Sequence, residues 1–368
     1  MMELTGQYNS CKIFTDNIDS TTISQIINIL NQPQFKDSKI RIMPDAHAGK
    51  GCVIGTTMTF SDKIVPNLVG CDIACGVLYV KLKETEIDLP MLDAVIKQYV
   101  PNGASLHDRD LTHPEDKRVL ESLKNLRAGI SMNRITRSLG TLGGGNHFIS
   151  LEKDDKFIYL VIHTGSRHLG KALCDYYQNK AVLYCSHKGV WTPEDLTYLS
   201  GKDMDDYLHD SQIATEFAKQ NRRSIARTIM EHMDLHMFDI NETVHNYVDY
   251  DAKIIRKGAV RATYGEELII PINMRDGSLI CTGFGQPDWN FSAPHGAGRL
   301  LSRSEAKSKI SLDEYEKSMQ GIYSSCIKSS TLDESPKAYK AIDEIMKNIT
   351  SSVNVKTHIK PIYNFKAS

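Results

Sequence analysis

The spacing of hydrophobic and polar residues predicts helices and strands that alternate along the chain. Residues 19–32 begin with Asp, Ser and Thr, continue with apolar residues at helical spacing and stop before Pro33, which predicts a capped helix. Residues 52–60 and 76–82 are rich in apolar and β-branched side chains and predict strands. Further helices are expected over residues 86–99, 114–127, 168–182, 211–238, 296–308 and 336–349.

More strands are expected in the centre and the second half of the chain. Residues 157–162 form an apolar run, FIYLVI, which predicts a buried strand that ends at His163. The β-branched content rises from 251 to 284, and residues 353–366 predict a final strand or an extended tail. Residues 183–210 are polar and contain Gly, Pro and several acids, so we expect an excursion between two helices. The predicted class is a mixed α/β fold with helices packed around a sheet-centred core.

The composition is ordinary for a globular protein, with 41% hydrophobic and 24% charged residues. The net charge of −1 gives no overall basic footprint, so a nucleic-acid partner would have to be held by a local patch. The sequence contains no apolar run of about 18 residues and no apolar signal core near its N-terminus. We therefore expect a cytoplasmic protein whose eight cysteines are thiols or metal ligands rather than disulfides.

Metal-ligand side chains recur in short, glycine-containing patches. Asp72 and Cys75 lie three residues apart in a glycine-bounded turn, and three histidines, His147, His163 and His245, stand beside Gly or Asn or at a strand end. Taken singly, each residue also fits a structural role, as a turn former, a small buried hydrophobe or a hydrogen-bonded histidine. Together they exceed the needs of one ion and suit a centre of two first-row ions such as Mn, Fe, Co or Zn. A zinc knuckle at Cys71 and Cys75 would need a second downstream cysteine pair, which the sequence lacks.

A second kind of patch combines glycine with arginine or histidine. His295 precedes Gly296, Ala297, Gly298 and Arg299 at the expected start of a helix, and a helix N-terminus of this kind favours phosphate. A neutral imidazole there is a candidate ligand, general acid or base, or nucleophile. Arg167 follows Gly165 and Ser166 in a similar anion-friendly turn.

In this order, the patches resemble the RtcB family of RNA-splicing ligases. The resemblance runs from about residue 40 to the end of the chain. The matching segments are residues 43–51 (MPDAHAGKG), 69–76 (VGCDIACG), 139–148 (LGTLGGGNHF), 163–167 (HTGSR), 245–246 (HN), 256–259 (RKGA), 295–303 (HGAGRLLSR) and 338–343 (AYKAID). It implies one RtcB-like domain over residues 1–368 with a central metal and nucleotide cleft.

The resemblance implies an enzyme that joins an RNA 3′-phosphate or 2′,3′-cyclic phosphate to a 5′-hydroxyl, using GTP and two Mn²⁺ ions. The nucleophile would be His295, which takes GMP before the RNA 3′ end does. The metal ligands would be Asp72, Cys75 as the bridge, His147, His163 and His245. The nucleotide would be held by Asn146, Asn246, His295, Gly296, Ala297, Gly298, Arg299, Tyr339 and Lys366. The RNA would be contacted by Arg167 and Arg303.

Other parts of the resemblance are looser. Asp45 would support the site in a role that the motif does not define. The local clusters at 222–223 and 256–257 are candidates to hold an RNA backbone or are simply solvated charges. An archease-type activator or a release-factor-H-like protein is a possible partner of a chain expected to be monomeric.

Two departures from the family pattern concern nucleotide recognition. Ser150 stands where the family usually has Glu, and Glu152 follows two residues later. Residues 271–277 carry Arg275 and Asp276, charges that the usual loop lacks. These differences indicate a divergent branch, of the release-factor-H-coupled type, that would repair damaged RNA. They also keep two alternatives open, a metal-dependent phosphoesterase of RNA 3′ ends and a non-catalytic RNA- or nucleotide-binding factor.

Overall fold

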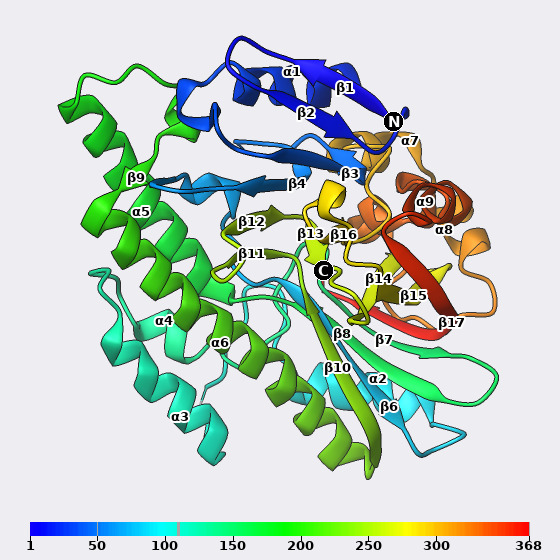
Figure 1. The fold of residues 1–368 in the computed structure, drawn as a ribbon. Coiled ribbons are helices and arrows are strands. Elements are labelled where there is room, and N and C mark those ends of the chain that lie inside the picture. Colours follow the sequence, from blue (N-terminus) through cyan, green and yellow to red (C-terminus); the bar gives the residue numbers. More distant parts are fainter. Residues whose placement is uncertain (50, 109–110, 368) are drawn as a thin grey trace.

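A computed structural model describes residues 1–49, 51–108 and 111–367 of the chain. It shows two large β-sheets with helices packed around them (Figure 1). The predicted mixed α/β class is confirmed. Lys50, within the 43–51 motif, lies outside the described residues. No helix among the described residues is both long and apolar enough to cross a membrane.

The first sheet has six strands, and its neighbours are antiparallel except for one parallel pair, β2 and β3. In spatial order its strands are β1 (Met2–Thr5), β2 (Ser10–Ile13), β3 (Ile40–His47), β4 (Ile54–Thr59), β12 (Ile254–Lys257) and β11 (Asn246–Asp249). Its core side packs on α1 (Ser20–Leu30) and on two long helices, α5 (Arg167–His187) and α6 (Gly201–Met233).

The second sheet has seven antiparallel strands and is buried on both faces near its centre. In spatial order its strands are β10 (Met237–Val244), β6 (Gly76–Leu82), β8 (Ile158–Thr164), β7 (Phe148–Lys153), β17 (Val353–Lys366), β15 (Gly277–Gly283) and β14 (Glu267–Asn273). One face packs against α2 (Leu89–Tyr99) and α6. Every residue of β8 is buried, as its apolar run predicts.

Smaller elements complete the fold. In Figure 1 helices α5 and α6 lie side by side, and α7, α8 and α9 gather on the other side of the molecule. The two short ladders are β13 (Ala259–Arg261) with β16 (Ser292–Pro294) and β5 (Lys63–Ile64) with β9 (Leu199–Ser200). The remaining helices are α3 (Pro114–Ser122), α4 (Asn133–Thr136), α7 (Arg303–Lys309), α8 (Leu312–Ser318) and α9 (Ile342–Ile349).

The predicted helix over 296–308 is wrong in its first half. Only Arg303–Lys309 is helical, and a capping box between Ser302 and Glu305 marks the true start. Gly298 has φ +75°, and a Cβ there would lie 2.3 Å from the carbonyl oxygen of Asp45. The glycines therefore serve a close passage of two backbones, so the segment after His295 is not a helix N-terminus.

The predicted excursion over 183–210 is shorter than expected. Helix α5 continues to His187 and α6 begins at Gly201. Two acids expected in this loop, Asp206 and Asp210, lie in α6 and are paired: Asp206 binds Lys202 one turn away, and Asp210 accepts a hydrogen bond from the backbone amide of Ala128. At its other end the helix predicted over 211–238 stops at Met233, and β10 follows. The helix expected over 336–349 is a 3-10 turn followed by α9.

Candidate active site

The register of the second sheet brings four strand ends to one edge. Gly76 of β6 pairs with Thr164 of β8 and with Val244 of β10, while Phe148 of β7 pairs with His163. The residues just beyond these pairs, Cys75, His147 and His245, must therefore meet beside His163. Lys366 of β17 pairs with Phe148 and reaches the same edge.

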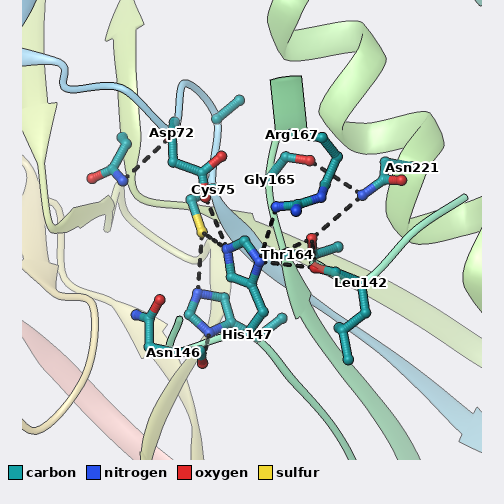
Figure 2. A network of polar contacts seen from close by, with 12 residues as sticks. Asp72, Cys75, Leu142, Asn146, His147, Thr164, Gly165, Arg167 and Asn221 are labelled. Carbon is teal, nitrogen blue, oxygen red and sulfur yellow. Dashed lines mark hydrogen bonds and ion pairs between the residues drawn. The ribbon is translucent and has the colours of Figure 1, made fainter. Parts of the chain in front are cut away.

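The predicted metal ligands converge at this edge. The Sγ atom of Cys75 lies 3.5 Å from Nε2 of His147 and 3.3 Å from Nε2 of His163, which is itself 3.3 Å from Nε2 of His245. The Oδ2 atom of Asp72 lies 2.8 Å from Nε2 of His147, and a dashed line marks this contact in Figure 2. The ligand atoms form two groups, Cys75 with His163 and His245, and Cys75 with Asp72 and His147. A thiolate shared by two groups fits two ions bridged by Cys75.

In His147 and His163 the Nδ1 atom, which faces away from the cluster, is hydrogen-bonded to a backbone carbonyl. Nδ1 of His147 donates to the carbonyl of Leu142 at 2.9 Å, and Nδ1 of His163 donates to the carbonyl of Asn146 at 3.2 Å. These contacts fix the orientation of both rings, with Nε2 facing the cluster. Sulfur, imidazole and carboxylate donors in this arrangement suit a first-row ion.

The electrostatics of the cluster also favour cations. Burial, reinforced by neighbouring histidines, lowers the pKa of His163 and of His245 well below the usual range, so both imidazoles are neutral, the form that a metal ion needs. Burial would raise the pKa of Asp72, but the hydrogen bond and charge of His147 and the charge of Arg167 outweigh it and bring it to about 2. Burial and the charge of Asp72 raise the pKa of Cys75, so its thiolate form requires a cation beside it.

The loop that carries Asp72 and Cys75 is held from several sides. Arg222 is fully buried, pairs with Glu242 and donates to the carbonyls of Ala74 and Thr164 at 2.9 and 2.6 Å. Neither alternative for Arg222, an RNA-backbone contact or a solvated charge, is correct, because its guanidinium is paired inside the protein. Both alternatives are also wrong for Arg256, which is fully buried and lies 2.7 Å from Asp249.

Two other basic residues, Lys257 and Arg167, lie close to the site. Lys257 is buried, donates to the carbonyl of Asn67 at 2.9 Å and lines the cavity described below. Arg167 has φ +54° at the start of α5, and its guanidinium lies 3.2 Å from Nδ1 of His147 (Figure 2). It thus stands behind the metal ligands rather than on the surface. The amide of Asn246 donates to the carbonyl of Asp72 and accepts from the amide of Gly258.

His295 is oriented by a buried carboxylate from the other sheet. Oδ2 of Asp45, on β3, lies 2.6 Å from Nδ1 of His295 and also accepts the backbone amides of His295 and Gly296 at 3.1 and 3.3 Å. The ring centroids of His295 and His245 are 4.8 Å apart. A proton held on Nδ1 by Asp45 leaves Nε2 of His295 as a nucleophilic lone pair beside the metal ligands.

Three of the predicted nucleotide residues, Arg299, Tyr339 and Lys366, gather on a carboxylate that sequence reasoning missed. Glu334 is buried and accepts from Nζ of Lys366 at 2.5 Å and from the hydroxyl of Tyr339 at 2.8 Å. Nη1 of Arg303 lies 3.0 Å from it, and Arg299 lies 3.6 Å away. Burial would raise the pKa of Glu334, but these cations lower it.

This cluster changes the picture of Arg303, which was predicted to contact RNA. Its Nη1 atom also lies 2.6 Å from Asp333, although the side chain remains 46% exposed. Much of its charge is therefore neutralised by two acids. Neither Asp333 nor Glu334 belongs to a glycine or histidine motif, so the sequence held no signal that marked them.

A single cavity of about 1040 Å³ connects these groups. It is lined by four of the five predicted metal ligands, Asp72, Cys75, His163 and His245, and also by His295 and Glu334. It extends to Phe148, Glu152 and Ser278. These four residues and the predicted nucleotide residues thus border one space large enough for a nucleotide.

The departures from the family pattern lie at this extension. Ser150 and Glu152 are on the same face of β7, and the hydroxyl of Ser150 donates to Oε1 of Glu152 at 2.8 Å. Burial raises the pKa of Glu152 to about 7, against the opposing hydrogen bonds of Ser150 and Ser278. Arg275 and Asp276 pair with each other at 2.8 Å, so the loop gains little net charge.

Comparison with known proteins gives consistent matches over most of the chain. The family described as tRNA-splicing ligase RtcB matches residues 25–367. RNA-splicing ligase RtcB of Escherichia coli K12 is 31% identical over 388 residues, which cover 93% of this chain and 94% of that protein. The tRNA-splicing ligase RtcB of Nanoarchaeum equitans is 27% identical over 433 residues, covering 92% and 90%. The matched range contains every candidate site residue named above.

Proposed function

Since the chain belongs to the tRNA-splicing ligase RtcB family, we propose that it is an RNA ligase that joins a 3′-phosphate or 2′,3′-cyclic phosphate end to a 5′-hydroxyl end. The observation that carries the proposal is His295, held through Nδ1 by buried Asp45 next to the Cys and His cluster. The proposed activating nucleotide is GTP, and the proposed ions are two Mn²⁺.

His295 would act as the nucleophile. Its Nε2 lone pair attacks the α-phosphorus of GTP, a P–N bond forms, and pyrophosphate leaves. Asp45 keeps the proton on Nδ1 and stabilises the positive charge that grows on the ring. The GMP group then passes to the RNA 3′-phosphate, so that attack by the 5′-hydroxyl expels GMP. One difficult condensation becomes a series of easier displacements.

The ions would be held by Asp72, Cys75, His147, His163 and His245. When bound, they supply positive charge that neutralises the transferring phosphoryl group and its leaving group. Arg222 and Arg167 would keep the ligand shell in place, because they contact the loop and His147 from behind.

The nucleotide would lie between His295 and the Glu334 cluster. Arg299, Tyr339 and Lys366 are oriented by Glu334 and so present a preset group of donors. Glu152 would supply the carboxylate that position 150 lacks, since it projects from the same strand face and lines the same cavity. The proposed divergent branch would then differ in base contacts and keep the same chemistry.

The alternatives explain less of this arrangement. A phosphoesterase needs the ions but neither a guanylylated histidine nor the nucleotide-binding group around Glu334, and a non-catalytic binding factor needs no nucleophile. The paired Asp45 and His295 therefore favour ligation.

Guanylylation of His295 can be tested directly. The purified full-length chain is incubated with Mn²⁺ and α-³²P-labelled GTP and run on a denaturing gel, beside His295→Ala and the control His187→Ala, which changes an exposed histidine at the end of α5. We expect label on the wild type and the control and none on His295→Ala. Absence of label from a wild-type protein that binds Mn²⁺ would contradict the proposal and favour a phosphoesterase.

A further inference from the structure

Two sulfur atoms that the proposed chemistry does not use lie beside the metal-binding loop. The Sγ atoms of Cys71 and Cys174 are 3.1 Å apart. Cys71 directly precedes Asp72, is partly exposed and lines the cavity. Cys174 projects from α5 and is 2% exposed.

The loop lies along one face of α5. A Cβ on Gly170 would be 2.9 Å from the carbonyl oxygen of Cys71 and 3.0 Å from the amide nitrogen of Ile73. Two turns further along, the side chain of Gln178 accepts a hydrogen bond from the amide of Asn67 at 3.2 Å. Positions 170, 174 and 178 are stacked on one helix face, so Cys174 sits at the middle of this contact.

We propose that Cys71 and Cys174 form an oxidant-sensitive dithiol, whose disulfide draws the metal-binding loop against α5 and weakens metal binding at Asp72 and Cys75. The disulfide needs no contact with the nucleotide. Its effect on metal binding rests on the proposed metal centre, because that effect passes through the ligands next to Cys71.

Hydrogen peroxide is the proposed two-electron oxidant of the Cys71 and Cys174 thiols. The Cys71 sulfur, which is the one that borders the cavity, loses its proton and attacks hydrogen peroxide, giving a sulfenic acid as the O–O bond breaks and water leaves. The Cys174 sulfur then attacks the Cys71 sulfur, the S–O bond breaks and a second water leaves. In total the two thiols lose two protons and two electrons, and the peroxide takes them up and becomes two waters.

The size of the movement explains the effect on metal binding. A disulfide bond is about 2.05 Å long, so the two sulfurs must approach by about 1 Å. Metal–ligand distances tolerate deviations of only about 0.2 Å. Asp72 also has little room to compensate, because a Cβ on neighbouring Gly165 would lie 2.2 Å from its Oδ1 atom.

Disulfide mapping tests the first half of the proposal. The reduced full-length chain is treated with hydrogen peroxide, digested without reductant and measured by mass spectrometry. We expect a cross-linked pair of peptides containing Cys71 and Cys174, two hydrogens lighter than their sum, which dithiothreitol separates. Stable sulfinic acid on Cys71 without a cross-link, or a cross-link through Cys75 instead, would overturn the proposal.

Mn²⁺ titration before and after peroxide tests the second half. We expect the wild type and the control Cys185→Ser, a buried cysteine elsewhere on α5, to lose about tenfold or more in Mn²⁺ affinity, and Cys174→Ser and Cys71→Ala to keep it. An equal loss in Cys174→Ser would trace the effect to oxidation of Cys75 and refute the switch. If the reduced wild type binds no Mn²⁺, the proposed metal centre is refuted. The peptide map still tests the Cys71–Cys174 disulfide independently.

Discussion

Asp45 and His295 are 250 positions apart in the sequence, yet Oδ2 of Asp45 lies 2.6 Å from Nδ1 of His295. The carboxylate comes from β3 of the first sheet and the histidine follows β16, so the contact joins two parts of the fold beside the cavity that His295 lines. The same oxygen accepts two backbone amides, which fixes the position of the His295 segment as well as its ring.

Replacement of Asp45 tests its role in orienting the nucleophile. Asp45→Asn keeps the shape of the side chain but replaces a carboxylate, which only accepts hydrogen bonds, with an amide that both donates and accepts. The amide no longer holds the proton on Nδ1 of His295. We expect the rate of His295 guanylylation to fall roughly 10- to 100-fold, with Mn²⁺ affinity nearly unchanged. The control Asp37→Asn, at an exposed position, should label like the wild type. A loss of Mn²⁺ binding in Asp45→Asn would show instead that Asp45 supports the whole site.

Single-ligand variants test the two metal groups. His147 belongs to one group, His245 to the other, and Cys75 to both. Titration with Mn²⁺, followed by the electron paramagnetic resonance of the free ion, should show one bound ion lost in His147→Ala and one in His245→Ala. Cys75→Ser should weaken both. Two ions bound with unchanged affinity in Cys75→Ser would contradict a bridging thiolate.

Gly165 offers a way to disturb the site without removing a ligand. A Cβ at this position would lie 2.2 Å from Oδ1 of Asp72, so Gly165→Ala must displace the carboxylate. We expect Mn²⁺ binding to weaken by about tenfold or more. The matched control is Gly129→Ala, where a Cβ meets no atom within 4 Å. Equal Mn²⁺ affinities for the two variants would mean that Asp72 does not bind the ion.

The raised pKa of buried Glu152 predicts that the free energy of unfolding depends on pH. Burial raises its pKa from 4.5 to about 7, so the folded state holds this proton more tightly than the unfolded state. The resulting stabilisation is fully present below about pH 4.5 and is lost as the pH rises to about 7. Glu152→Gln removes the titration, so its stability relative to the wild type should increase across this window by at most about 3 kcal/mol.

Urea unfolding of both proteins between pH 4.5 and 8 measures this difference. The control Glu305→Gln changes an exposed glutamate of the α7 cap and should shift stability without the same trend above pH 5. A constant difference between Glu152→Gln and the wild type would mean that Glu152 is ionised throughout.

The sequence predicted those helices, strands and candidate ligands that depend on residues close together in the chain. Asp19 caps α1 as its spacing predicted, and the apolar run before His163 forms a fully buried strand. Asp72 and Cys75 were recognisable as candidate ligands because turn, glycine and donor atoms are neighbours in the chain. Such features depend on residues within a few positions of each other, which the order of residues states directly.

What only the tertiary structure decided depends on contacts between distant residues. The sequence alone could not show that Asp45 orients His295, that Glu334 gathers Lys366 and Tyr339, or that Arg222 is buried behind the metal ligands. A charged side chain has the same sequence signature whether it faces solvent or a buried partner, because burial is determined by strands and helices that meet across the fold. The sequence by itself therefore determined the family and the donor atoms of the site, and strand register together with buried charge pairing decided how those atoms are oriented.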